Sequence, residues 1–333
     1  MVTSLCLSVF VVNPFLRYVS IGDAEVRNRI PDHLNTNRPP RVAASTYLNT
    51  APLIWSFLHG PRKNDVRLAP DASPARCASL LARGEVEAAL VPVIEYQRIP
   101  EIAVVPGVCV GSHSAVRSVV IASRYDDLKA VRRVALDGSS RTSVALVEIL
   151  FREFFGFAPE WEIAAPNLDA MLTRNDAALI IGDPAMTMIY GTWSRYRTGS
   201  GSDRVGAGTD AGGPQAGMPA LPLHVFDLAT LWREHTGLGF VFAMWMALEG
   251  AAERIRVIDL PGARDEGLAH VDEIAASYEP LLNLPQAELR TYLTENISFS
   301  LDEEMRAGME LFFKLAYKHG IIPEVHRLKM IDE

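Results

Sequence analysis

The densest group of chemically useful side chains lies in residues 136–143, which hold four hydroxyl groups, one arginine and one glycine. An apolar run precedes this segment and a helical pattern follows it, so a strand is expected to pass into a helix here. The first turn of a helix carries free N–H groups and the positive end of the dipole, which together bind carboxylates or phosphates. A helix cap needs only one of these residues. We therefore expect an anion site formed by Ser140, Arg141, Thr142 and Ser143.

A second polar stretch, residues 45–50, follows the first expected strand. Asn49 offers both a hydrogen-bond donor and an acceptor, and Tyr47 offers an aromatic wall with a hydroxyl group. With Ser45, these side chains are expected to face a ligand cleft. A turn also favours Ser and Asn for purely local hydrogen bonds, so the stretch alone is equally compatible with a structural role.

A third polar cluster contains Ser112, Ser114 and Ser118. His113 and Ser114 are adjacent, but the chain has no G-x-S-x-G motif, so a nucleophilic serine is not favoured. Gly182 and Asp183 end another apolar run, where the carboxylate either orients a substrate hydroxyl or caps the next element.

Composition excludes several classes of function. The 32 Lys and Arg residues against 40 Asp and Glu residues leave a formal charge of −8, and no basic run is present, which argues against nucleic-acid binding. Histidines and cysteines show no metal-ligand spacing, and no phosphate-binding P-loop or dinucleotide fingerprint occurs. With 49% hydrophobic and 22% charged residues, the chain has ample material for a core. We expect neither a metal nor a cofactor.

From residue 41 onward, apolar runs alternate with helical patterns, which is typical of α/β proteins. We expect one lobe from residues 41–121 and 237–333, and a second lobe from residues 122–236. A chain that leaves one lobe and returns to it creates a cleft, where ligands prefer to bind. The carboxyl ends of the strands should face that cleft. The Gly-, Ser- and Asp-rich residues 195–221 are expected to form a flexible surface insertion.

Residues 1–40 are expected to form a poorly ordered extension. Their apolar start has no Lys or Arg before it and is shorter than the roughly 20 residues that span a bilayer. The three cysteines are scattered, as in proteins of a reducing compartment. We expect a cytoplasmic protein without a membrane anchor.

Four stretches, in this order, resemble the chorismate dehydratase family of the futalosine route to menaquinone: residues 45–52, 136–146, 178–183 and 236–243. The helical tail 301–323 is also similar to that family, so the resemblance covers about residues 41–330. It implies a two-lobed type II periplasmic-binding-protein fold used as a cytoplasmic enzyme. The implied reaction converts chorismate to 3-[(1-carboxyvinyl)oxy]benzoate and water without a cofactor.

The resemblance also assigns roles within the expected site. It implies that Asn49 and Ser118 lie beside the reacting ring, where they polarise the leaving hydroxyl or hold an intermediate. The two substrate carboxylates match a helix N-terminus with Arg141. No strong base stands out among the cleft candidates, so we expect a carboxylate of the substrate to accept the proton.

Two alternatives remain open at this point. One is a non-enzymatic solute-binding protein for an acidic metabolite, since a fold does not by itself imply chemistry. The other is the 1,4-dihydroxy-6-naphthoate synthase of the same pathway. The Ser-Ser-Arg-Thr-Ser run at 139–143 favours the dehydratase.

Overall fold

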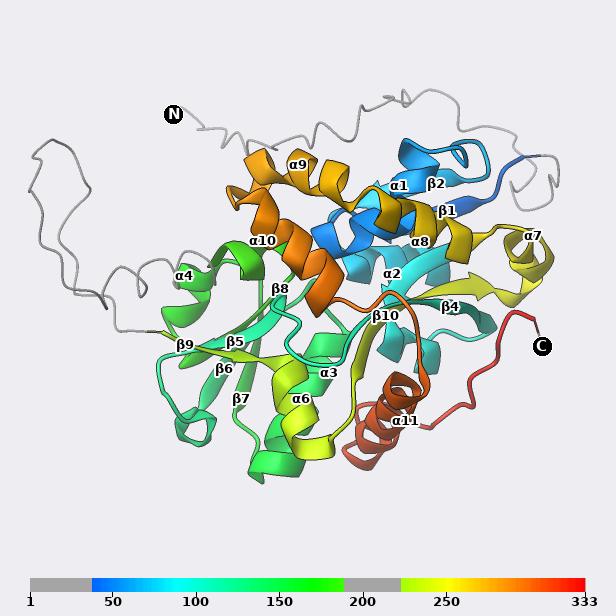
Figure 1. Cartoon of the computed structure of the whole chain (residues 1–333). Coiled ribbons are helices and arrows are strands. Elements are labelled where there is room, and N and C mark those ends of the chain that lie inside the picture. The colour runs from blue at the N-terminus through cyan, green and yellow to red at the C-terminus, as the bar shows by residue number, and fades with distance from the viewer. Residues whose placement is uncertain (1–37, 189–222, 333) are drawn as a thin grey trace, which may run out of the picture.

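The structure is a computed structural model that describes residues 38–188 and 223–332. Their strands form two five-stranded sheets (Figure 1). The expected extension, apart from residues 38–40, and the expected insertion at 195–221 lie outside the described residues.

The first sheet has the strand order β2-β1-β3-β10-β4. β1 pairs in parallel with β2 and β3, whereas β10 runs antiparallel to both β3 and β4. Every residue of β3 is buried, as expected of a central strand covered on both faces. The strands of this sheet are β1 (Arg41–Ser45), β2 (Arg67–Asp71), β3 (Ala88–Pro92), β4 (Ile102–Ser112) and β10 (Phe240–Leu248).

The second sheet repeats this pattern with the strand order β7-β6-β8-β5-β9. β6 is parallel to β7 and β8, and β5 is antiparallel to β8 and β9. Its strands are β5 (Val119–Ser123), β6 (Arg133–Asp137), β7 (Glu160–Ala164), β8 (Ala177–Ile181) and β9 (His224–Asp227).

Twice the chain crosses between the sheets. It leaves the first sheet after β4, through residues 113–118, and returns through residues 237–239 to β10. The boundary expected after residue 121 therefore falls inside β5, because the crossing is completed a few residues earlier. The two-lobed α/β arrangement expected from the sequence is confirmed.

Helices cover both sheets. In the first half of the chain they are α1 (Ala51–Leu58), α2 (Pro74–Ala82), α3 (Thr142–Ile149) and α4 (Leu168–Leu172). Beyond residue 223 they are α6 (Leu228–Thr236), α7 (Ala252–Arg256), α8 (Leu260–Ala269), α9 (Val271–Leu282), α10 (Gln286–Thr291) and α11 (Glu303–Lys318). No helix within residues 38–188 and 223–332 is long and apolar enough to cross a membrane.

An aromatic cluster supports the return crossing. Trp232 of α6 is fully buried, and its indole N–H donates to the carbonyl of Gly239 at 3.2 Å. The ring of Phe240 lies edge-on to Trp232 and to Phe312 of α11, with centroids 5.3 and 5.1 Å apart. These aromatic residues belong to the hydrophobic core. The cluster fixes β10 against helices of both lobes.

A close approach between α1 and α8 yields a stability prediction. The Cα of Gly267 lies so near the carbonyl of Pro52 that an added Cβ would overlap it. Gly267→Ala should therefore lower the free energy of unfolding by roughly 1–3 kcal/mol through overpacking. Gly250 has nothing within 4 Å of the added Cβ. Gly250→Ala should stay within about 0.5 kcal/mol of the parent in urea denaturation, and equal losses in the two variants would contradict the packing.

Candidate functional site

A cavity of about 60 Å³ lies between the two sheets. Its polar wall comes from the loop after β1 and from the start of α3, and its apolar wall comes from strands of both sheets. The polar lining residues are Ser45, Tyr47, Asn49, Thr50, Ser140, Thr142 and Ser143, and the others are Pro74, Leu90, Pro92, Val110, Val119, Ile181, Gly182, Phe242 and Ala243. Ser45, Pro92 and Ile181 end parallel strands, which is where ligands bind in open α/β sheets.

The loop after β1 is held by its own hydroxyl groups. A 3₁₀ turn at Leu48–Thr50 leads into α1, whose first turn accommodates a proline without losing a hydrogen bond. The hydroxyls of Ser45 and Thr50 are 2.8 Å apart, and Thr50 Oγ1 donates to Asn49 Oδ1 at 3.3 Å. The structure thus places Ser45, Tyr47 and Asn49 at the cavity, as expected.

The start of α3 forms the opposite wall. Ser140 Oγ accepts from the backbone N–H of Ser143 at 3.2 Å, and Thr142 Oγ1 accepts from the N–H of Ile94 at 3.3 Å. Asp137, at the end of β6, accepts from the N–H and the hydroxyl of Ser139. The helix N-terminus and the side chains of Ser140, Thr142 and Ser143 therefore lie at the cavity, where the sequence placed them.

Arg141 differs from the expectation. Its guanidinium forms an ion pair with Glu95 at 2.5 Å and donates to Ser79 Oγ at 2.9 Å, and it is not among the residues that line the cavity. Glu95 is only 2% exposed, so a buried carboxylate requires a cationic partner there. No Asp, Glu, Lys, Arg or His is among the residues that line the cavity.

Contacts between the lobes converge on Tyr47 and its neighbours. The N–H of Leu48 donates to Asp183 Oδ1 at 2.9 Å across the cleft. The phenol of Tyr47 has Ser139 of the other lobe as its hydrogen-bonding partner. Burial, together with the nearby carboxylates of Asp137 and Asp183, raises the pKa of Tyr47 to about 12 against the lowering effect of that hydrogen bond.

Ser118 lies behind the cavity rather than on its wall. It is fully buried, its carbonyl accepts from the N–H of Gly182 at 2.7 Å, and its Oγ accepts from the phenol of Tyr292 at 2.7 Å. Sequence reasoning missed Tyr292, because it lies 174 residues from Ser118 and outside every motif. Phe242 also forms part of the cavity wall.

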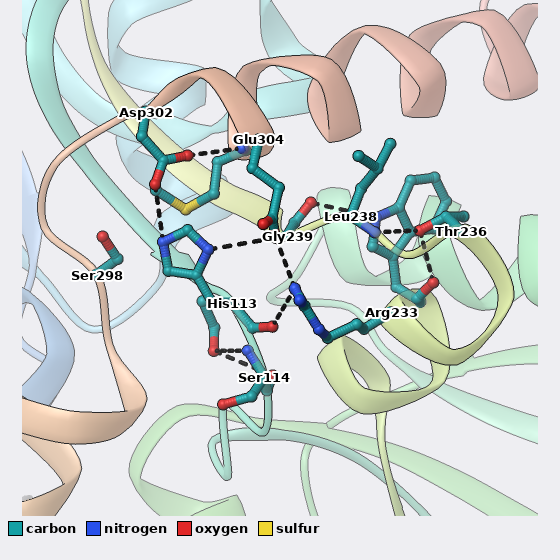
Figure 2. Close-up of polar contacts among 12 residues, drawn as sticks. His113, Ser114, Arg233, Thr236, Leu238, Gly239, Ser298, Asp302 and Glu304 are labelled. Carbon is teal, nitrogen blue, oxygen red and sulfur yellow. Dashed lines mark hydrogen bonds and ion pairs between the residues drawn. The ribbon is translucent and has the colours of Figure 1, made fainter.

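The other two residues of the third polar cluster lie apart from Ser118: Ser112 ends β4, and Ser114 lies in the crossing that follows it (Figure 2). Ser112 and Ser114 bond to each other in a local turn, at 3.0 and 3.2 Å. His113 lies 2.9 Å from Asp302, and Arg233 of α6 pairs with Glu304 of α11 at 2.5 Å. Neither Ser112 nor Ser114 is among the residues that line the cavity, so the structure does not bring them to the expected site.

In the described ranges, 38–188 and 223–332, no three His, Cys, Asp or Glu side chains gather where they could hold a metal ion. The cavity is instead surrounded by hydroxyls, one amide, a helix N-terminus and apolar side chains. Such a set can bind and orient a polar ring compound and polarise one of its groups.

Gly182 provides a test of lobe closure. Its φ is +65°, and an added Cβ would lie 2.7 Å from the ring of Tyr47 in the other lobe. Gly182→Ala should hold the lobes apart and increase the radius of gyration in small-angle X-ray scattering. Gly156 has a φ of +81° with nothing within 4 Å, so Gly156→Ala carries only the backbone strain, about 1–2 kcal/mol. The same radius for both variants would refute the contact.

Asp183 provides a test of charge at the same contact. It is half-buried, and burial raises the pKa of its carboxyl from 3.8 to about 7, although the Leu48 N–H opposes the shift. The native state therefore binds this proton more tightly than the unfolded state. The stability that this group contributes is complete below about pH 4 and is lost as the pH rises through 7. Asp183→Asn cannot titrate, so its stability relative to the parent should increase from pH 5 to pH 8 in urea denaturation.

A matched control is Asp259→Asn. Asp259 accepts a bond from the N–H of Gly262, which lowers its pKa, so its titration lies below this pH window. Its difference from the parent should stay flat between pH 5 and pH 8. A flat difference for Asp183→Asn as well would show that this carboxyl has an ordinary pKa.

Comparisons with known proteins agree with this architecture. The family described as menaquinone biosynthesis matches residues 40–318. A chorismate dehydratase of Thermus thermophilus is 31% identical over 282 residues, which are 83% of this chain and 94% of that protein.

Solved structures show the fold. A protein from Archaeoglobus fulgidus has a TM-score of 0.60 at 15% identity, over 85% of this chain and 98% of its own. The periplasmic aliphatic sulphonate binding protein of Escherichia coli has a TM-score of 0.52 at 12% identity, over 87% and 92% of the two chains. The expected periplasmic-binding-protein-like fold is confirmed. Because the family match covers most of its length, the chain belongs to the menaquinone biosynthesis family.

Proposed function

We propose that this chain is a chorismate dehydratase that converts chorismate to 3-[(1-carboxyvinyl)oxy]benzoate and water. The similarity to the dehydratase of Thermus thermophilus, over 94% of that protein, carries the proposal. The interlobe cavity supports it, because Asn49 and the start of α3 face one space from two different lobes.

The chemistry suits such a cavity. Chorismate loses the proton from the ring carbon that bears the enolpyruvyl ether and the hydroxyl from the neighbouring carbon, and these two leave together as one water. The ring becomes aromatic, so the step is strongly downhill and requires no oxidation or reduction. We propose that it proceeds without a cofactor. The protein then has to position the substrate, accept or relay a proton and assist the departing hydroxyl.

The groups available to bind the substrate dianion are hydroxyl and backbone N–H dipoles, not charged side chains. Ser140, Thr142 and Ser143 place hydroxyls and the first turn of α3 at the cavity, and Arg141 is already paired with Glu95. We propose that one substrate carboxylate binds at this helix N-terminus. Neutral donors held in advance stabilise an anion without bringing a second fixed charge into an apolar space.

We propose that Asn49 lies beside the departing hydroxyl of the substrate. Its amide lies on the cavity wall, where an N–H can donate to the oxygen that leaves. No carboxylate or imidazole lines the cavity. We therefore propose that the enolpyruvyl carboxylate of the substrate accepts the ring proton and passes it to the departing hydroxyl, which leaves as water.

Incubation of the purified protein with chorismate tests the proposal. The diene absorbance should disappear and the enolpyruvyl benzoate should form, which chromatography identifies. Asn49→Ala should lower kcat/KM by about 100-fold, because it removes a donor aimed at developing charge. Asn175→Ala is a matched control: this amide is also buried, but it bonds to Glu162 and Met171 away from the cavity.

The control should lose stability and keep its turnover. Intact chorismate after long incubation with the parent protein would refute the dehydratase. Offering the cyclised futalosine derivative in the same assay separates the dehydratase from 1,4-dihydroxy-6-naphthoate synthase. Tight binding of chorismate without conversion would instead identify a solute-binding protein.

A further inference from the structure

Tyr292 is a buried residue that connects the two side chains expected to act on the ring. It follows α10 and is 1% exposed. Its phenol donates to Ser118 Oγ at 2.7 Å, and the side chain of Asn49 lies close enough to the same phenol to lower its pKa against the effect of burial. Ser118 lies in the crossing between the lobes and Asn49 in the loop after β1, so the phenol bridges two separate segments.

Local structure fixes this phenol in place. The helix widens into a π-helical turn at Tyr292–Asn296, a change that redirects side chains and is frequent at functional sites. Leu289 and Leu293, on either side of Tyr292 in the sequence, are almost fully buried. In Figure 1 the orange α10 runs from the top of the molecule toward its middle and ends there.

The hydrogen bonds around Tyr292 have a defined direction. Burial raises the pKa of the Tyr292 phenol well above its usual value, so the group stays protonated and donates its one proton to Ser118. The oxygen of that phenol can then only accept, which turns the Asn49 NH₂ group toward it. Asn49 Oδ1 already accepts from Thr50. Both ends of the amide are thereby assigned, and one N–H is left for the cavity.

Ser118 belongs to the same chain of bonds. Because it is fully buried and absent from the cavity wall, it has no direct path to a bound ring in this closed arrangement. Its hydroxyl contacts the phenol, and through the phenol it acts on Asn49. On the basis of the proposed function, we propose that Tyr292 is a positioning residue: its hydroxyl aligns the Asn49 amide toward the leaving hydroxyl and connects Ser118 to that amide.

Tyr292→Phe removes the hydroxyl and keeps the ring. It should lower kcat for chorismate by about 10- to 100-fold and leave KM within about threefold, because the donor is misaligned while the binding groups of α3 stay in place. Ser118→Ala should give a similar loss. The double variant Tyr292→Phe/Ser118→Ala should be no slower than the slower single variant, since both changes break one connection.

Tyr96→Phe is the matched control. Tyr96 is also buried, and its phenol bonds to the carbonyl of Arg327 at 2.8 Å and the N–H of Lys329 at 2.7 Å. It is not among the residues that line the cavity. It should lower the melting temperature and keep kcat. If the role of Tyr292 were merely structural, Tyr292→Phe would also lower the melting temperature and leave kcat unchanged.

The outcomes separate this inference from the proposed function. If the parent protein does not convert chorismate, both are refuted. If the parent is active and Tyr292→Phe or Ser118→Ala keeps the parent kcat, or if their losses multiply in the double variant, only the positioning role is refuted. Should Tyr292→Phe fail to fold, a parent-like kcat for Ser118→Ala would still refute the positioning role.

Discussion

The contact between the loop after β1 and the end of β8 is the constraint on which the cavity depends. Leu48 donates its N–H to Asp183, and the ring of Tyr47 lies against Gly182, which has no side chain to prevent it. These bonds join segments from different lobes. Without them, Asn49 and the start of α3 would still exist, but they would not face one space.

Around that contact the molecule keeps its charges out of the cavity. Arg141 shares the buried Glu95 with Arg98. Elsewhere, His113 pairs with Asp302 and Arg233 pairs with Glu304. The cavity is left with hydroxyls, an amide and helix dipoles on one side and apolar side chains on the other. The cavity of about 60 Å³ is much smaller than the ligand pockets of roughly 300–1,000 Å³ that are usual for small molecules.

Local patterns in the sequence predict much of this architecture, but not the long-range pairs. Alternating apolar runs indicate the α/β lobes, and the hydroxyl-rich segment correctly predicts the helix that starts at Thr142. By contrast, Glu95 lies 46 residues from Arg141 in a buried turn after β3, so nothing near Arg141 reveals its partner. Only the crossing geometry brings Tyr292 to Ser118 and places His113 among the carboxylates of α11. The periodicity of apolar residues predicts which face of a helix or strand is buried and where the element ends. Side-chain partners such as these depend on how helices and strands far apart in the sequence pack together.

A crystal structure with bound 3-[(1-carboxyvinyl)oxy]benzoate tests most directly whether uncharged groups of two lobes hold the ligand. The account predicts density for the aromatic ring beside Asn49, with a carboxylate in hydrogen-bonding distance of Ser140, Thr142 or Ser143 and with Arg141 still paired to Glu95. Density for the ligand outside the interlobe space, or a carboxylate bound by an Arg141 that has left Glu95, would contradict it.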